Sequence, residues 1–223
     1  MEPSLDQKKR ALGIVLLIVF LGAGGLFVYY QQPVAPPRET TVTPNADVAP
    51  QASVHEHELG NKDAPVTLIE YASLTCPHCA YFNEKVFPEL KTRFIDTGKV
   101  RYIFREYPRD DLDLFAFMLS NCAPEDKFFP FVDVLFRQQD KWLVPSPLPI
   151  LKGIAKQVGF TDESFDACTK DKKIQDAVIA VGEQGTKNGV RGTPTIFING
   201  KIYSGGPSIE ELEKAITPLL KSS

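Results

Sequence analysis

The strongest constraint on the fold is a strand, a helix and a second strand that follow one another within residues 66–104. Residues 66–71 are mostly apolar and rich in β-branched side chains, which is typical of a buried strand. Apolar residues keep helical spacing over residues 80–95, and residues 100–104 again have the pattern of a strand. Two strands joined by a helix form a βαβ unit, so we expect them to lie parallel in one sheet.

The rest of the chain adds helices and then returns to the sheet. The pattern is helical over about residues 108–189, with a cluster of prolines near the middle. Residues 195–203 then predict a β-hairpin, because Asn199-Gly200 is the strongest short hairpin signal, and an amphipathic helix follows. We therefore predict an α/β domain over residues 58–223 with an inserted helical module.

Length and charge limit the classes of protein that need to be considered. The 223 residues are 43% hydrophobic, which is enough for one domain with a core and a tail. The formal net charge is −3, and no basic stretch carries interleaved aromatic residues. We therefore expect no nucleic-acid partner.

Residues 11–30 are apolar and carry no charge. As a helix rising ~1.5 Å per residue they would span ~30 Å, the thickness of a bilayer core. Residues 8–10 are basic, and the next basic residue is Arg38. This asymmetry predicts a transmembrane anchor, with residues 1–10 in the cytoplasm and the rest of the chain outside it. The alternatives are a cleaved signal peptide, whose apolar region is usually ~7–15 residues long, and a buried core helix.

Residues 31–57 are rich in proline and lack hydrophobic periodicity, so we interpret them as a semi-extended linker. His55 and His57 near its end could bind a metal as an H-x-H pair. We favour the simpler interpretation of two polar residues at the end of a linker, and we expect no metal site.

Cys76 and Cys79 form a C-x-x-C motif, which occurs both in zinc sites and in redox centres. A structural zinc site needs a second close pair, and the other two cysteines stand far apart. The motif also lies where the first strand gives way to the helix, so Cys76 is expected at the helix N-terminus. Unpaired backbone N–H groups and the helix dipole stabilise a thiolate there, and His78 can add a donor or a positive charge. Cys79 then serves as the shielded resolving thiol.

The chain resembles the DsbA family of extracytoplasmic dithiol oxidases over about residues 58–221. Two short segments carry the resemblance, the cysteine tetrad and the opening of the late strand: Cys76-Pro77-His78-Cys79 and Gly192-Thr193-Pro194-Thr195. The resemblance implies a thioredoxin-like fold whose helical module is an insertion. It also implies catalysis by the tetrad without a cofactor.

The family resemblance implies a thiol:disulfide oxidoreductase that introduces disulfides into unfolded or exported cysteine-containing proteins. Reoxidation would need a DsbB-like membrane quinone reductase as partner. The implied location is the bacterial inner membrane, with a single pass at residues 11–30 and the catalytic domain in the periplasm. If that segment is cleaved, the protein is exported and soluble. We expect a monomer.

The resemblance also gives expected roles to three residues outside the tetrad. Pro194 would be cis and lie beside the cysteines, and Thr193 would offer its backbone to a substrate strand. The alternative for Pro194 is an ordinary turn proline before a strand. Glu70 would be a buried carboxylate with a raised pKa that shuttles the proton of Cys79, the alternative being a solvated charge at the strand end.

Cys122 and Cys168 lie in two predicted helices of the insertion. In an exported domain they most simply form a structural disulfide, and some DsbA-like proteins have a second cysteine pair in this region. The alternatives are two buried free thiols or a second redox relay.

Thr193 also leaves a second function open. The best-known oxidase of the family has valine at this position, whereas several isomerases have threonine. A reductase or isomerase that is kept reduced is therefore the main alternative to an oxidase. The intact tetrad beside Thr193 and Pro194 argues against a non-catalytic chaperone and against a zinc-binding module.

Overall fold

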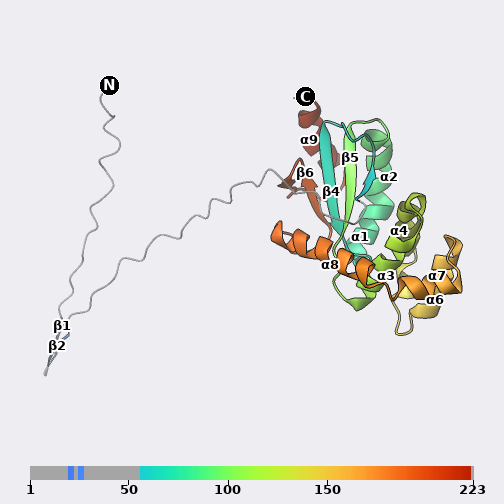
Figure 1. Ribbon diagram of the computed structural model, residues 1–223. Coiled ribbons are helices and arrows are strands. Elements are labelled where there is room, and N and C mark those ends of the chain that lie inside the picture. Colours follow the sequence, from blue (N-terminus) through green and yellow to red (C-terminus); the bar gives the residue numbers. More distant parts are fainter. Residues whose placement is uncertain (1–19, 23–24, 28–55, 222–223) are drawn as a thin grey trace. The chain divides into compact units, whose positions relative to one another are not determined.

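The computed structural model describes residues 20–22, 25–27 and 56–221 of the protein (Figure 1). The chain divides into two units, residues 1–43 and 44–223. In the first unit, strand β1 (Phe20–Gly22) pairs antiparallel with strand β2 (Gly25–Phe27). Across the described residues, no helix is long and apolar enough to cross a membrane.

The expected anchor at residues 11–30 lies largely outside the described residues, which include β1 and β2 from that segment. Residues 1–10 and 31–55, and with them His55, also lie outside the described part of the chain. The membrane helix, its cytoplasmic flank and the linker therefore stay predictions.

Five strands of the second unit form one sheet in the order β3-β5-β4-β6-β7. Their bounds are β3 (His57–Leu59), β4 (Val66–Ala72), β5 (Val100–Glu106), β6 (Thr195–Ile198) and β7 (Lys201–Ile202). Strands β4 and β5 are parallel, and the other neighbouring pairs are antiparallel. The predicted parallel pair and the late hairpin are confirmed.

Strand β3 begins within the segment that the sequence led us to interpret as linker. Its three residues are too few to show an alternating pattern, and pairing with β5 is what holds them extended. His57 at its start has Nε2 3.1 Å from the Asn121 Oδ1 and stacks on Phe128. Within residues 56–221, no group of three or more His, Cys, Asp or Glu is arranged to hold a metal.

A helix of mixed geometry over residues 77–95, here called the redox helix, connects β4 to β5. It consists of α1 (Pro77–Tyr81), a π-helical stretch (Phe82–Val86), α2 (Phe87–Leu90) and a second π-helical stretch (Lys91–Ile95). Pro88 has no N–H to donate within α2, and the helix widens to i→i−5 hydrogen bonding on both sides of it.

The insertion is helical, as its sequence pattern predicts. Its helices are α3 (Asp111–Cys122), the short 3-10 helix η3 (Glu125–Lys127), α4 (Phe128–Arg137), α5 (Gln139–Trp142), α6 (Leu148–Gln157), α7 (Asp162–Cys168) and α8 (Lys172–Lys187). The last residues of α3 and α7, Cys122 and Cys168, are joined by a disulfide with a Cα–Cα distance of 6.0 Å.

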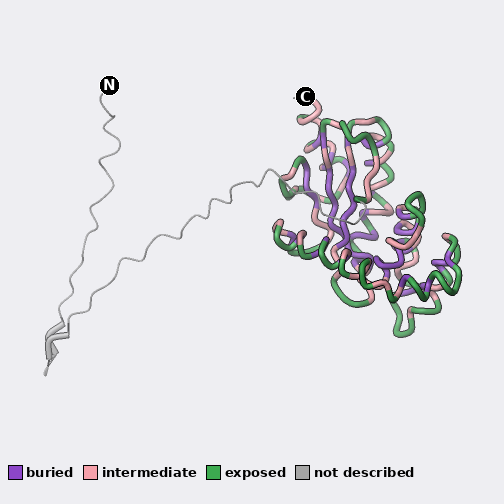
Figure 2. Tube along the Cα trace, viewed as in Figure 1, coloured by how far each residue is buried: buried purple, intermediate pink, exposed green. Residues whose placement is uncertain are grey.

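The two faces of the sheet are covered by different helices (Figure 1). Leu68 and Ala72 of β4 belong to the larger core, which the redox helix, the insertion and α9 (Ile209–Leu220) cover. Tyr71 faces the other side, where Val181 of α8 packs against the sheet. Figure 2 shows β4, β5 and β6 largely buried between these layers. Because side chains alternate along a strand, Glu70 also faces the larger core.

Candidate active site

The two cysteines of the candidate site lie where β4 leads into the redox helix. Cys76 is the N-cap of α1, with extended backbone angles, and Pro77 follows at the first helical position. The Cys76 N–H donates to the Ser73 carbonyl (3.2 Å), which closes the turn that leads into the helix. Cys76 is 3% exposed and Cys79 is completely buried, and both are free thiols.

The environment of Cys76 favours its thiolate. Its pKa is lowered to about 4, chiefly by a hydrogen bond from the Cys79 thiol, while burial opposes the shift. The Thr193 side chain and the backbone N–H groups of Cys79 and His78 lower the pKa further. The backbone N–H groups at the helix terminus thus favour the thiolate, with a smaller effect than the Cys79 thiol. His78 contributes its backbone N–H to the Cys76 sulfur.

Cys79 experiences the opposite effect. Burial raises its pKa well above the ordinary value, and the hydrogen bond that its thiol donates to Cys76 and the charge of Glu70 raise it further. One cysteine of the pair is thus held as a nucleophile while the other keeps its proton. A thiolate at the helix terminus and a protonated thiol one turn inside are the states that dithiol–disulfide exchange requires.

A segment 117 residues away in sequence completes the site. The Thr193–Pro194 bond is cis, and the Cys76 sulfur lies 3.3 Å from the Thr193 carbonyl oxygen. Among the described residues, the Thr193 hydroxyl is the buried side-chain polar group without a hydrogen-bond partner. The Cys76 thiol can donate to the carbonyl. Once Cys76 is a thiolate, the free hydroxyl can donate to the sulfur instead.

Glu70 is 2% exposed, so it is not the solvated strand-end charge considered as an alternative. The Tyr102 hydroxyl donates to Glu70 Oε2 at 2.6 Å. The pKa of Glu70 is raised to about 7, mainly by burial and further by the charge of Cys76, while Tyr102 opposes the rise. Glu70 can therefore be either charged or neutral near neutral pH, as a proton shuttle requires.

Two residues of the insertion hold the loop before Cys76, and sequence reasoning missed both. The buried Asp113 carboxylate accepts the Leu74 N–H at 2.8 Å and the Arg109 N–H at 3.0 Å. Gln139 Nε2 donates to the carbonyl oxygens of Leu74 (2.6 Å) and Cys76 (3.1 Å). Burial raises the pKa of Asp113 to about 6. No local pattern marks either residue, because the partners that they hold in this loop lie 39 to 65 residues away.

Comparison with known proteins places this site in a family. The family model described as Thioredoxin matches residues 52–217. The chain belongs to the thioredoxin family. Within the family it is similar to DsbA-like proteins. It is 33% identical to alpha-DsbA1 of Wolbachia pipientis, whose crystal structure superposes with a TM-score of 0.72 over 78% of this chain and 94% of that one. The chain is therefore a DsbA-like member, as its resemblance implies.

Two sequence relatives agree with this placement. A Rickettsia bellii protein named as a candidate protein-disulfide oxidoreductase is 39% identical over 168 residues, which are 74% of this chain and 64% of that protein. This chain thus spans less than two thirds of that curated relative. A Bacillus anthracis protein named as a candidate disulfide bond formation protein D is 28% identical over 97% of this chain and 98% of its own length.

Replacement of Glu70 by glutamine is expected to change how the stability of the reduced protein depends on pH. A carboxyl whose pKa is higher in the folded state binds its proton more tightly there, so the free energy of unfolding falls as pH rises from 4.5 to about 7. Above that window the full penalty of the buried charge, about 3 kcal/mol, should separate wild type from the more stable variant.

Denaturant unfolding of the reduced proteins across this pH window measures the difference. Glu183→Gln, at an exposed position of α8, is the control and should follow the wild type. If the curves of Glu70→Gln and wild type run parallel through the window, Glu70 does not titrate there.

Proposed function

We propose that this protein is an extracytoplasmic thiol:disulfide oxidoreductase that introduces disulfides into exported proteins. The observation that carries the proposal is the opposite effect of the site on its two thiols. The pKa of Cys76 is lowered to about 4, and that of Cys79 is raised. A stable Cys76 thiolate favours the reduced form over the disulfide, which makes the disulfide a strong oxidant.

The exchange then proceeds in two steps. A substrate thiolate attacks the Cys76 sulfur of the Cys76–Cys79 disulfide, and the sulfur of Cys79 leaves and takes up a proton. A second substrate thiolate attacks the substrate sulfur of the mixed disulfide, and Cys76 leaves as its stabilised thiolate. The substrate dithiol is oxidised to a disulfide while the enzyme disulfide is reduced to two thiols. In this proposal Glu70 supplies the proton that Cys79 needs, and Thr193 offers its backbone to the substrate strand.

The remaining parts of the proposal concern location and partners. Cys-containing exported proteins are the proposed substrates, and a DsbB-like quinone reductase in the membrane is the proposed source of oxidising equivalents. We place the protein at the bacterial inner membrane, anchored through residues 11–30 and facing the periplasm, or in soluble form there if that segment is cleaved. The Cys122–Cys168 disulfide supports an oxidising compartment.

An isomerase or reductase is the second candidate, because the residue before the cis proline is Thr193. Its hydroxyl is buried against the site without a hydrogen-bond partner among the described residues, so it can interact with the Cys76 sulfur. Such an enzyme would be kept reduced by electrons delivered from elsewhere.

The reduction potential of Cys76–Cys79, measured against glutathione on the full chain, separates the two candidates. We expect a value nearer to the ~−120 mV of DsbA than to the ~−270 mV of thioredoxin. The ultraviolet absorbance of the thiolate should titrate with a midpoint of about 4 and be lost in Cys76→Ser. A potential close to that of thioredoxin would contradict the oxidase and favour the reductase or isomerase.

A further inference from the structure

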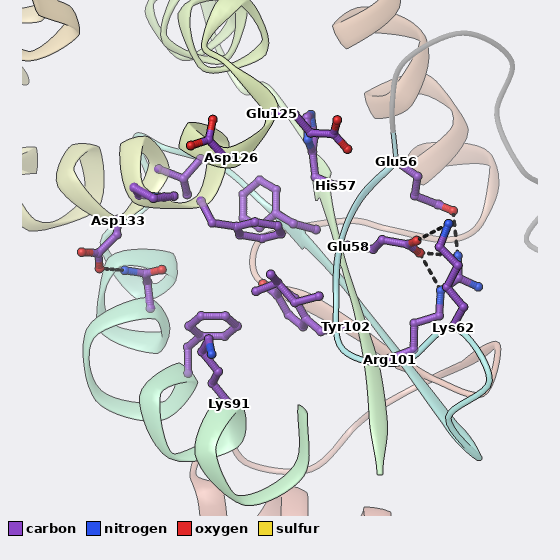
Figure 3. Close-up of a pocket in the computed structure, with 17 residues that line it drawn as sticks. Glu56, His57, Glu58, Lys62, Lys91, Arg101, Tyr102, Glu125, Asp126 and Asp133 are labelled. Carbon is purple, nitrogen blue, oxygen red and sulfur yellow. Dashed lines mark hydrogen bonds and ion pairs between the residues drawn. The ribbon is translucent and has the colours of Figure 1, made fainter. Parts of the chain in front are cut away.

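Tyr102 lies between the buried carboxylate of the site and a cavity on the flank of the domain. Its side chain is 2% exposed, and its hydroxyl donates to Glu70 Oε2 at 2.6 Å. Its ring helps to line a cavity of about 710 Å³ between β3, β5, the redox helix and α4 (Figure 3). Tyr102 is therefore both a lining residue of this cavity and a hydrogen-bond partner of Glu70.

The ring of Tyr102 is held on two sides. Phe87 of the redox helix packs on it with a centroid distance of 4.9 Å, and Phe129 of α4 with one of 6.2 Å. Both phenylalanines also line the cavity. Because two aromatic neighbours fix the ring, the hydroxyl is already oriented toward Glu70 and little conformational entropy is lost when the hydrogen bond forms.

The polar surroundings of Glu70 are sparse. Tyr102 reaches it from β5. The redox helix presents Cys76, whose charge raises the pKa of Glu70, and Cys79, whose own pKa is raised by the charge of Glu70. Strand β6 and helix α9 supply apolar side chains to the same core, among them Ile196 and Leu212.

The Lys and Arg side chains of the cavity wall are engaged with other partners. Arg101 pairs with Glu58 (Figure 3). Lys91 pairs with Asp96, which lies outside the cavity lining. Within residues 56–221, the hydroxyl of Tyr102 is therefore the hydrogen-bond donor that the structure gives to the Glu70 carboxylate.

We propose that Tyr102 is a positioning residue for proton transfer at the buried thiol, which keeps the Glu70 carboxylate oriented and able to accept the proton of Cys79. The proposal rests on the proposed function of the site. When Cys79 attacks a mixed disulfide at Cys76, its S–H bond breaks and the proton passes to Glu70. The Cys76–Cys79 bond forms, and the other thiol leaves as a thiolate.

The chemistry of a phenol suits this role. Burial raises the pKa of Tyr102 well above its ordinary value, so its hydroxyl stays protonated and always has a proton to donate. A neutral donor stabilises the charged carboxylate without placing a second charge in the core. Without it, burial alone would keep Glu70 protonated to a higher pH, and a protonated carboxyl cannot accept the proton of Cys79.

The test uses the full chain carrying glutathione on Cys76 as a mixed disulfide. The release of glutathione by Cys79 is followed over a range of pH in wild type and in Tyr102→Phe, which removes the hydroxyl and keeps the ring. We expect the midpoint of the pH profile to move up by about one unit, so that release is about tenfold slower below the midpoint and similar well above it. In a Glu70→Gln background, Tyr102→Phe should have no further effect.

Tyr71→Phe is the matched control. Tyr71 is a buried tyrosine of the neighbouring strand whose hydroxyl contacts Arg105 and Asn188 on the other face of the sheet, and its loss should leave the midpoint unchanged. If Tyr102→Phe slows release equally at every pH, or slows it as strongly in the Glu70→Gln background, Tyr102 acts through packing and the proposal is wrong.

A second readout covers the case in which the variant does not fold. In wild-type protein with isotope-labelled tyrosine, the Tyr102 ring signal should shift with the same midpoint as glutathione release, and a constant signal would overturn the proposal. Neither readout depends on whether the enzyme oxidises or reduces its substrates. A thioredoxin-like potential would therefore overturn the oxidase function and leave this inference standing.

Discussion

Replacement of Cys79 by serine is expected to stop turnover and to leave substrates attached to Cys76. Cys76 keeps its place at the helix terminus, where the backbone N–H groups of residues 78 and 79 still favour its thiolate. It can therefore still react with an oxidised partner, but no internal thiol remains to resolve the mixed disulfide. We expect the rate of release to fall by about three orders of magnitude or more.

The trapped species can be identified by mass spectrometry after incubation with a disulfide-containing peptide. Cys76→Ser is the matched control, because the remaining thiol of Cys79 is completely buried and its pKa is raised. It should form almost no adduct. An adduct on Cys79 in that control, or none on Cys76 in Cys79→Ser, would contradict the division of roles between the two thiols.

Removal of the Cys122–Cys168 disulfide is expected to have the second largest effect, on stability. The bond closes a loop with a sequence separation of 46, and on the chain-entropy model a cross-link of this size contributes about 4 kcal/mol. The doubly substituted Cys122→Ala/Cys168→Ala protein should lose about that much free energy of unfolding. Because both cysteines lie at helix ends within the insertion, the thiolate titration of Cys76 should not change.

Denaturant unfolding, with the slope checked for two-state behaviour, measures the loss. The control is Cys76→Ala/Cys79→Ala, which removes the other pair and keeps this bond. A loss below about 1 kcal/mol would contradict a structural role. If stability is kept but exchange activity is lost, the pair acts as a second redox relay.

The local sequence accounts for the elements that frame the site. Asn199 and Gly200 both adopt positive φ, 45° and 76°, and the chain reverses there as the sequence predicts. The change from the apolar run of β4 to Pro77 places Cys76 at a helix N-cap, because proline at the first helical position and a preceding extended residue are both local preferences. These features depend on neighbours in the chain, so periodicity and spacing were sufficient to predict them.

Contacts between distant segments decided the chemistry of the site. Glu70 receives its hydrogen bond from Tyr102, and the loop before Cys76 is held by Asp113 and Gln139. These partners are separated by 32 to 65 residues of sequence. Their residue types occur throughout the chain, so no pattern distinguishes them from surface or core residues. The order of strands in the sheet and the packing of the insertion determine which of them meet.

The sequence by itself determined that a pair of cysteines opens a helix after a buried strand, since that follows from the spacing of apolar residues and the position of Pro77. Only the tertiary structure decided how the two thiols differ. Thr193 is brought to the Cys76 sulfur, and the core closes over Cys79 and Glu70. The physical reason is that a pKa depends on burial and on the groups within a few ångströms, and folding determines both.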